Sequence, residues 1–161
     1  MSSNSDRLSV SRRISASAAV IFAIVADPRG HVQIDGSGML LASSDARPLQ
    51  RAGDIFEMDM DREPLGDLPI GKYKVINTVT SFVQDVEVAW TPQALGRPSA
   101  GQVWGYQLEA IGDKETEVTC YCDWSAIPQE WRERFSWPVV PAWMLERSLA
   151  NLERVATQPE I

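Results

Sequence analysis

The feature that most constrains the fold is a series of segments between residues 38 and 124 in which apolar and polar side chains alternate. Such alternation is typical of strands with one buried face, because successive side chains of a strand point to opposite sides of the sheet. Glycine, proline and aspartate turns separate the segments, which favours one antiparallel meander over alternating strands and helices. The expected strands are residues 38–42, 54–61, 72–84, 86–90, 102–111 and 115–124.

Elements of other kinds flank this series. Residues 8–14 also alternate and predict a first strand, after which residues 15–17 can cap an apolar helix. Pro28 ends that helix and can open a second, short one. Near the C-terminus, a short helix is expected at residues 128–135 and a long one from Pro141 onward. The apolar stripe of the long helix consists of Met144, Leu145, Ser148, Leu149, Leu152 and Val155.

This order, a strand, two short helices, six strands and a long helix, predicts an α+β helix-grip fold. In that fold a curved antiparallel sheet of about seven strands wraps around the C-terminal helix and leaves space between the two. A chain of 161 residues suits one domain. We therefore expect a disordered N-terminal tail at residues 1–7 and a single ligand-binding domain at residues 8–157.

The composition argues against several classes of partner. A net charge of −7 disfavours binding to nucleic acid or to anionic membranes, since both carry negative charge. No apolar run approaches the roughly 20 residues that a membrane-spanning helix needs, so membrane insertion is not expected. The polar start lacks the basic and apolar pattern of a signal peptide, and a cytoplasmic location is the resulting expectation.

No catalytic or cofactor motif stands out in the sequence. Glycine patterns for phosphates or dinucleotides, hydrolase nucleophile motifs and metalloprotease motifs are all missing. Cys120 and Cys122 would lie about 6.5–7 Å apart on one strand face, too far for an unstrained disulfide. A zinc site needs about four ligands, and the only histidine is remote in sequence, so we interpret both cysteines as small buried hydrophobes. We expect no metal and no cofactor.

Several short segments resemble a known family. They are Ala-Asp-Pro at residues 26–28, Gln-Ile-Asp-Gly-Ser-Gly at 33–38, Asn-Thr-Val-Thr at 77–80, Val-Ala-Trp at 88–90, Trp-Gly-Tyr at 104–106 with Leu-Glu at 108–109, Asp-Trp-Ser at 123–125 and Ser-Leu-Ala-Asn-Leu-Glu at 148–153. In this order they resemble the bacterial polyketide cyclase/dehydrase and lipid-transport family of the SRPBCC, or START-like, superfamily. The resemblance implies the helix-grip fold and a cavity for a small molecule. Members bind steroids, lipids, plant hormones and polyketides, and only some are enzymes.

The chain departs from this family in two places. Cys120 stands where the family has a polar or charged residue, and Cys122 stands where it has an aromatic one. These departures imply a less polar and roomier patch on the inner face of the sheet. Residues 132–143 are also unusually rich in aromatic side chains.

The inner face of each expected strand can be assigned from its charged residues. Glu57 and Lys74 mark outward faces, so their neighbours in sequence point inward. The inward set is rich in Trp, Tyr and Asn, which need hydrogen-bond partners when buried, and a ligand cavity can supply them. Methionine suits an adaptable cavity wall. The predicted ligand-binding residues are Met58, Met60, Tyr73, Asn77, Trp90, Trp104, Tyr106, Trp124 and Met144.

Three polar residues are candidates for acid–base chemistry, although no catalytic residue is assigned. His31 follows the first helix near the expected cavity mouth, where it could move a proton or be an ordinary solvated loop histidine. Asp35 precedes Gly36 and could be a polar gate, a general base or a turn-capping residue. Tyr106 is expected on the inner face, where it could donate a proton.

These features support three hypotheses of function. The first is binding of a small, largely hydrophobic molecule, of lipid, polyketide or aromatic type, in a cavity between the sheet and the C-terminal helix. The second, implied by the resemblance, is a polyketide cyclase, aromatase or dehydratase that holds a poly-ketone chain in shape without a metal or redox cofactor. The third is an interaction protein with a packed core, in which the aromatic residues 131–143 form a homodimer surface.

Overall fold

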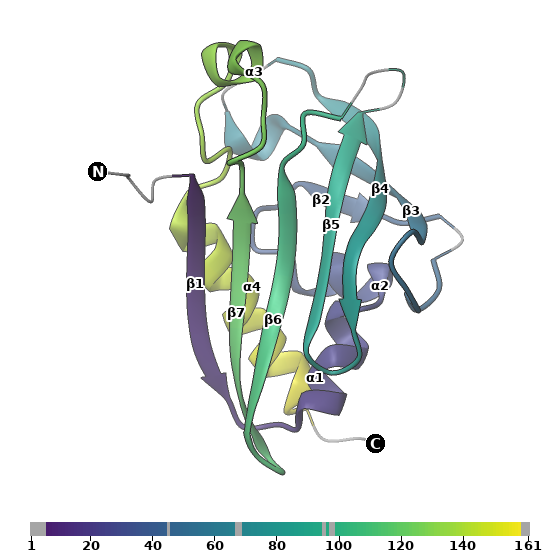
Figure 1. Ribbon diagram of the computed structural model, residues 1–161, viewed down its shortest axis with the longest axis vertical. Coiled ribbons are helices and arrows are strands. Elements are labelled where there is room, and N and C mark those ends of the chain that lie inside the picture. Colours follow the sequence, from purple (N-terminus) through teal and green to yellow (C-terminus); the bar gives the residue numbers. More distant parts are fainter. Residues whose placement is uncertain (1–5, 45, 67–68, 95, 97–98, 159–161) are drawn as a thin grey trace.

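A computed structural model describes residues 6–44, 46–66, 69–94, 96 and 99–158. Its main feature is a curved, seven-stranded antiparallel sheet with the strand order β1-β7-β6-β5-β4-β3-β2 (Figure 1). Helices cover one face of the sheet, which we call the inner face. The elements are β1 (Arg7–Ile14), α1 (Ala18–Val25), α2 (Pro28–Ile34), β2 (Leu40–Ala42), β3 (Ile55–Asp61), η1 (Glu63–Leu65), β4 (Lys72–Val83), β5 (Glu87–Ala94), β6 (Val103–Gly112), β7 (Glu115–Asp123), α3 (Gln129–Arg134) and α4 (Ala142–Ala156). This order confirms the predicted α+β helix-grip architecture.

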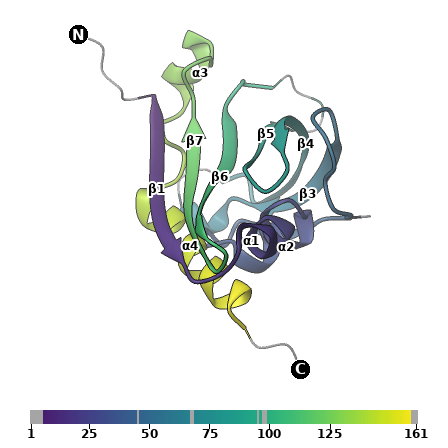
Figure 2. The same cartoon turned by 60° about the horizontal axis from the view of Figure 1, so that its bottom comes forward.

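The two short helices begin where the sequence supplies capping groups. At the start of α1 the Ser17 hydroxyl accepts a hydrogen bond from the Val20 amide at 3.2 Å. At the start of α2 the Asp27 carboxylate accepts one from the Arg29 amide at 2.9 Å, and Pro28 occupies the first turn. Both helices lie side by side at one end of the sheet (Figure 2).

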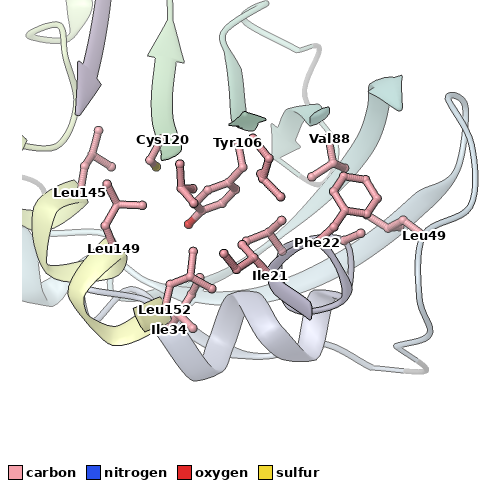
Figure 3. Close-up of a cluster of buried hydrophobic side chains, with 14 of the residues drawn as sticks. Ile21, Phe22, Ile34, Leu49, Val88, Tyr106, Cys120, Leu145, Leu149 and Leu152 are labelled. Carbon is pink, nitrogen blue, oxygen red and sulfur yellow. The ribbon is translucent and has the colours of Figure 1, made fainter. Parts of the chain in front are cut away.

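The hydrophobic core lies between the inner face of the sheet and α1, α2 and α4 (Figure 3). Ile21 and Phe22 come from α1, Leu152 comes from α4 and Val88 comes from β5, and all four side chains are buried. The predicted stripe of α4 is confirmed, since all of its members are buried except the half-buried Val155. These side chains lie on one face of α4 because the helix has 3.6 residues per turn, and this apolar face packs against the inner face of the sheet.

One strand is longer than the sequence pattern predicts. We expected β5 to end at Trp90, because proline cannot donate a ladder hydrogen bond and is rare inside a sheet. The strand continues through Pro92 to Ala94. Beyond Trp90 it is paired with β4 alone, while its pairing with β6 ends at Trp90, so a proline is tolerated there.

The expected disordered tail at residues 1–7 includes one residue, Arg7, that lies in a strand. Residues 1–5 lie outside the described part of the chain. Arg7 is the first residue of β1 and pairs with Asp123 of β7. The carbonyl oxygen of Asp6 accepts a hydrogen bond from the Trp124 amide at 2.9 Å, so the ladder extends one residue beyond the strand. Backbone pairing with β7 orders these two residues.

Candidate functional site

A cavity of about 820 Å³ lies between the inner face of the sheet, α2, α4 and the segment that follows α3. Its wall is mostly apolar, and it reaches the surface beside the exposed side chains of Ile70 and Arg134. Eight of the nine predicted ligand-binding residues line it, namely Met58, Met60, Tyr73, Asn77, Trp90, Trp104, Tyr106 and Met144. The three acid–base candidates, His31, Asp35 and Tyr106, line it too.

Trp124 is the predicted contact that does not line this cavity. β7 ends at Asp123, so the strand alternation that we extended to Trp124 no longer applies there. The side chain is buried in a separate small cluster with Cys122 and Ile127, where its ring lies 6.3 Å from the ring of Trp137. Trp124 borders an open groove beside α3 instead.

His31 is a buried helical residue, and the interpretation as a solvated loop histidine is wrong. The side chain is 4% exposed, because α2 packs it against the inner face of the sheet. Its ring stacks on Trp90 with 4.5 Å between ring centroids and meets the edge of Phe56 at 5.5 Å. Trp90 in turn lies 6.2 Å from Tyr106. Aromatic contacts from α2, β3, β5 and β6 therefore form one side of the cavity.

The protonation state of His31 follows from its surroundings. Burial lowers the pKa of its imidazole to about 4, so the ring is neutral at neutral pH. Nε2 lies 2.6 Å from the carbonyl oxygen of Val25, which can only accept a hydrogen bond. Nε2 therefore carries the proton, and Nδ1 presents a lone pair.

Asp35 serves as a turn residue, which was one of the alternatives considered for it. Its carboxylate accepts hydrogen bonds from the Ser37 amide at 3.0 Å, the Ser37 hydroxyl at 2.7 Å and the Leu40 amide at 3.1 Å. The next residue, Gly36, lies directly against α4, where a Cβ would collide with the helix backbone. Its amide donates to the Ser148 hydroxyl at 2.8 Å. The Asp35 turn and Gly36 therefore hold the connection between α2 and β2 against α4.

Tyr106 and Cys120 are neighbours across β6 and β7, and both are buried. Figure 3 shows the Tyr106 hydroxyl directed towards the helices. Burial, together with the adjacent thiol, raises the pKa of Tyr106 well above its usual value. Burial raises the pKa of Cys120 to about 12. Both groups keep their protons at neutral pH, and the interpretation of Cys120 and Cys122 as buried hydrophobes is confirmed.

Several residues of the cavity wall were not predicted, among them Gln102 and three aromatic residues. Gln102 lines the cavity, and strand alternation could have indicated it, since it lies two residues before Trp104 on the same face. Trp131, Phe135 and Trp137 line it from the far side, where we had considered a dimer surface. No periodic pattern joins these three residues to the sheet, because they belong to α3 and to the irregular segment after it.

Solved structures with the same architecture are numerous but distant in sequence. A protein from Arthrobacter aurescens superposes with a TM-score of 0.69 at 12% identity, over 96% of this chain and 88% of that one. Ginseng major latex-like protein 151 from Panax ginseng superposes with a TM-score of 0.64 at 11% identity, over 94% of this chain and 97% of that one. The chain has the START-like helix-grip fold. Identities this low establish the fold alone.

Curated relatives of this chain are few. The uncharacterized protein Rv0088 of Mycobacterium tuberculosis is 32% identical over 120 residues, which is 74% of this chain and 48% of that protein. The chain therefore spans about half the length of the curated relatives it matches. No protein-family model matches the chain. Within the described residues, no helix is both long and apolar enough to span a bilayer.

Proposed function

We propose that this START-like chain binds one small, largely hydrophobic molecule in the cavity between the sheet and α4. The cavity itself is the observation that carries the proposal. Its volume of about 820 Å³ lies within the range of roughly 300–1,000 Å³ that is usual for small-molecule sites. A wall of aromatic, methionine and aliphatic side chains with a few polar groups suits an apolar body that bears one or two polar substituents.

The aromatic segment after β7 supports the same proposal. Trp131, Phe135 and Trp137 turn towards the cavity, so this segment closes the space above the sheet. Trp143 is 50% exposed, and the guanidinium of Arg147 lies 4.6 Å from the centre of its ring. Most of the aromatic side chains that could have formed a homodimer contact therefore line the cavity of a single chain.

The alternative function, a polyketide cyclase, aromatase or dehydratase, would need groups that transfer protons to or from a poly-ketone. His31 has a lowered pKa and Tyr106 a raised pKa, so each is a poor proton carrier near neutral pH. The carboxylate of Asp35 is already engaged by the Ser37 and Leu40 amides. These features favour binding over proton transfer.

The experiment that tests the proposal obstructs the cavity by mutation. Val75 and Ile76 are neighbours on β4, but only Val75 lines the cavity. We expect Val75→Trp to weaken binding of the fluorescent apolar probe N-phenyl-1-naphthylamine, because the added indole takes up part of the space that the probe would occupy. Ile76→Trp, on the other face, should bind the probe as the parent protein does.

Native mass spectrometry of the purified protein, followed by solvent extraction, would identify a bound molecule directly. Circular dichroism checks that both tryptophan variants are folded. Equal probe binding by the parent protein and by Val75→Trp would show that the cavity is not the binding site and would refute the proposal.

A further inference from the structure

We propose that the ligand carries a hydrogen-bond donor, an O–H or N–H group, and that His31, Asn77 and Gln102 receive it on the cavity wall. This inference rests on the proposed binding function and adds the chemical class of the ligand. It follows from the position of these three residues and from the hydrogen bonds that each of them lacks.

The three side chains gather around one part of the sheet. Asn77 of β4 pairs with Phe56 of β3 on one side and with Pro92 of β5 on the other. The backbone of Gln102 lies on the far side of β5, where its carbonyl oxygen accepts a hydrogen bond from the Thr91 hydroxyl at 2.7 Å. Two carboxamides therefore flank Pro92, which has no polar side-chain atom between them.

His31 joins this group from α2. Its ring contacts Phe56, the cross-strand neighbour of Asn77, and stacks on Trp90, which lies two residues before Pro92 on the same face of β5. His31, Asn77 and Gln102 all line the cavity. A single polar substituent on a ligand that covers Trp90 and Pro92 would thus lie near all three.

Each of the three side chains has hydrogen-bonding capacity that the protein leaves unused. Nδ1 of His31 has a lone pair but no partner among the described residues, since Nε2 makes the bond to Val25. Gln102 Oε1 is itself buried and has no hydrogen-bond partner among the described residues. The Asn77 side chain is buried, and its carboxamide makes no hydrogen bond to another described residue.

These unpaired side-chain atoms favour a ligand that donates a hydrogen bond. The lone pair of the His31 Nδ1 and the oxygen of Gln102 can only accept, and Asn77 can both accept and donate. A hydroxyl group satisfies such a set, whereas an ether or a carboxylate has no proton to offer. His31 is neutral and offers an anion no counter-charge, and the ammonium of Lys74 at the cavity edge already pairs with Glu57 and Asp59.

Three pyrenes with the same ring system test this selection at pH 7. 1-Hydroxypyrene donates a hydrogen bond, 1-methoxypyrene only accepts one, and pyrene does neither. We expect 1-hydroxypyrene to bind about tenfold more tightly than the other two in a fluorescence titration, as one buried hydrogen bond predicts. Equal affinity for all three would overturn the inference and leave the proposed function intact, whereas no binding of any pyrene would refute both.

Two variants assign the preference to the named residues. Gln102→Met and Asn77→Leu should each reduce the preference for 1-hydroxypyrene at least threefold while pyrene still binds. Gln93→Met is the matched control, because Gln93 is exposed on β5 next to Pro92 and does not line the cavity. Gln102 is only half-buried and precedes β6, so its variant should fold even if Asn77→Leu does not. A preference that survives Gln102→Met unchanged would overturn the assignment.

Discussion

At the scale of single residues, His31 makes the stability of the protein depend on pH. Its pKa is about 4 in the folded chain and about 6.5 in an unfolded one. Between these values the unfolded chain binds a proton that the native state does not, so stability is full above pH 6.5 and falls as the pH drops towards 4. The total loss should be roughly 3 kcal/mol, since each pKa unit corresponds to about 1.4 kcal/mol.

Urea unfolding between pH 7 and pH 4.5 measures this loss. The sequence has a single histidine, so His31→Gln should remove most of the pH dependence in that window. The carboxylates with lowered pKa values, such as Asp27 and Asp123, titrate below it. Identical slopes for the parent protein and the variant would contradict the buried, neutral histidine.

At the scale of elements, a tyrosine lying across the outer face helps to hold the central strands together. Tyr121 of β7 extends over Gly105 of β6, and its hydroxyl donates a hydrogen bond to the Glu87 carboxylate of β5 at 2.8 Å. The guanidinium of Arg7 covers its ring at 3.9 Å from the centroid. A Cβ on Gly105 would lie 2.6 Å from the tyrosine oxygen and 2.9 Å from the Cβ of Ala89, so the ring depends on the glycine.

Two glycines of β6 allow a matched test of this contact. Gly105→Ala should lower the free energy of unfolding by about 1–3 kcal/mol, because the methyl group displaces the Tyr121 ring and its hydrogen bond. Gly112→Ala meets no atom within 4 Å and should change stability by less than about 0.5 kcal/mol. Chemical denaturation compares the two variants, and similar stability for both would show that the ring moves aside without cost.

The sequence predicted the start of a helix or strand correctly where a single local feature, such as a capping residue or a proline, determines it. The Ser17 cap and Pro28 mark helix starts that the structure reproduces. The end of β5 was not predicted, because a proline usually stops a strand, and only the one-sided pairing with β4 shows why Pro92 is accommodated.

At the scale of the whole molecule, an occupied cavity should stabilise the fold. A ligand that binds only the native state at 100 times its Kd contributes about 2.7 kcal/mol, which corresponds to a rise in Tm of roughly 5–10 °C for a chain of this size. N-phenyl-1-naphthylamine should produce this rise in the parent protein and a smaller one in Val75→Trp. A thermal scan showing the same rise in both proteins would locate probe binding outside the cavity.

The sequence by itself determined the elements, their order and the inward face of most strands. Side chains two residues apart must share a face of a strand, so charges such as Glu57 and Lys74 were enough to orient Met58 and Val75 inward. Only the tertiary structure decided that His31 stacks on Trp90 and that Phe135 lines the cavity while Trp124 does not. These facts depend on how α2 and the segment after β7 pack against strands remote in sequence, and such packing produces no periodic pattern in the sequence.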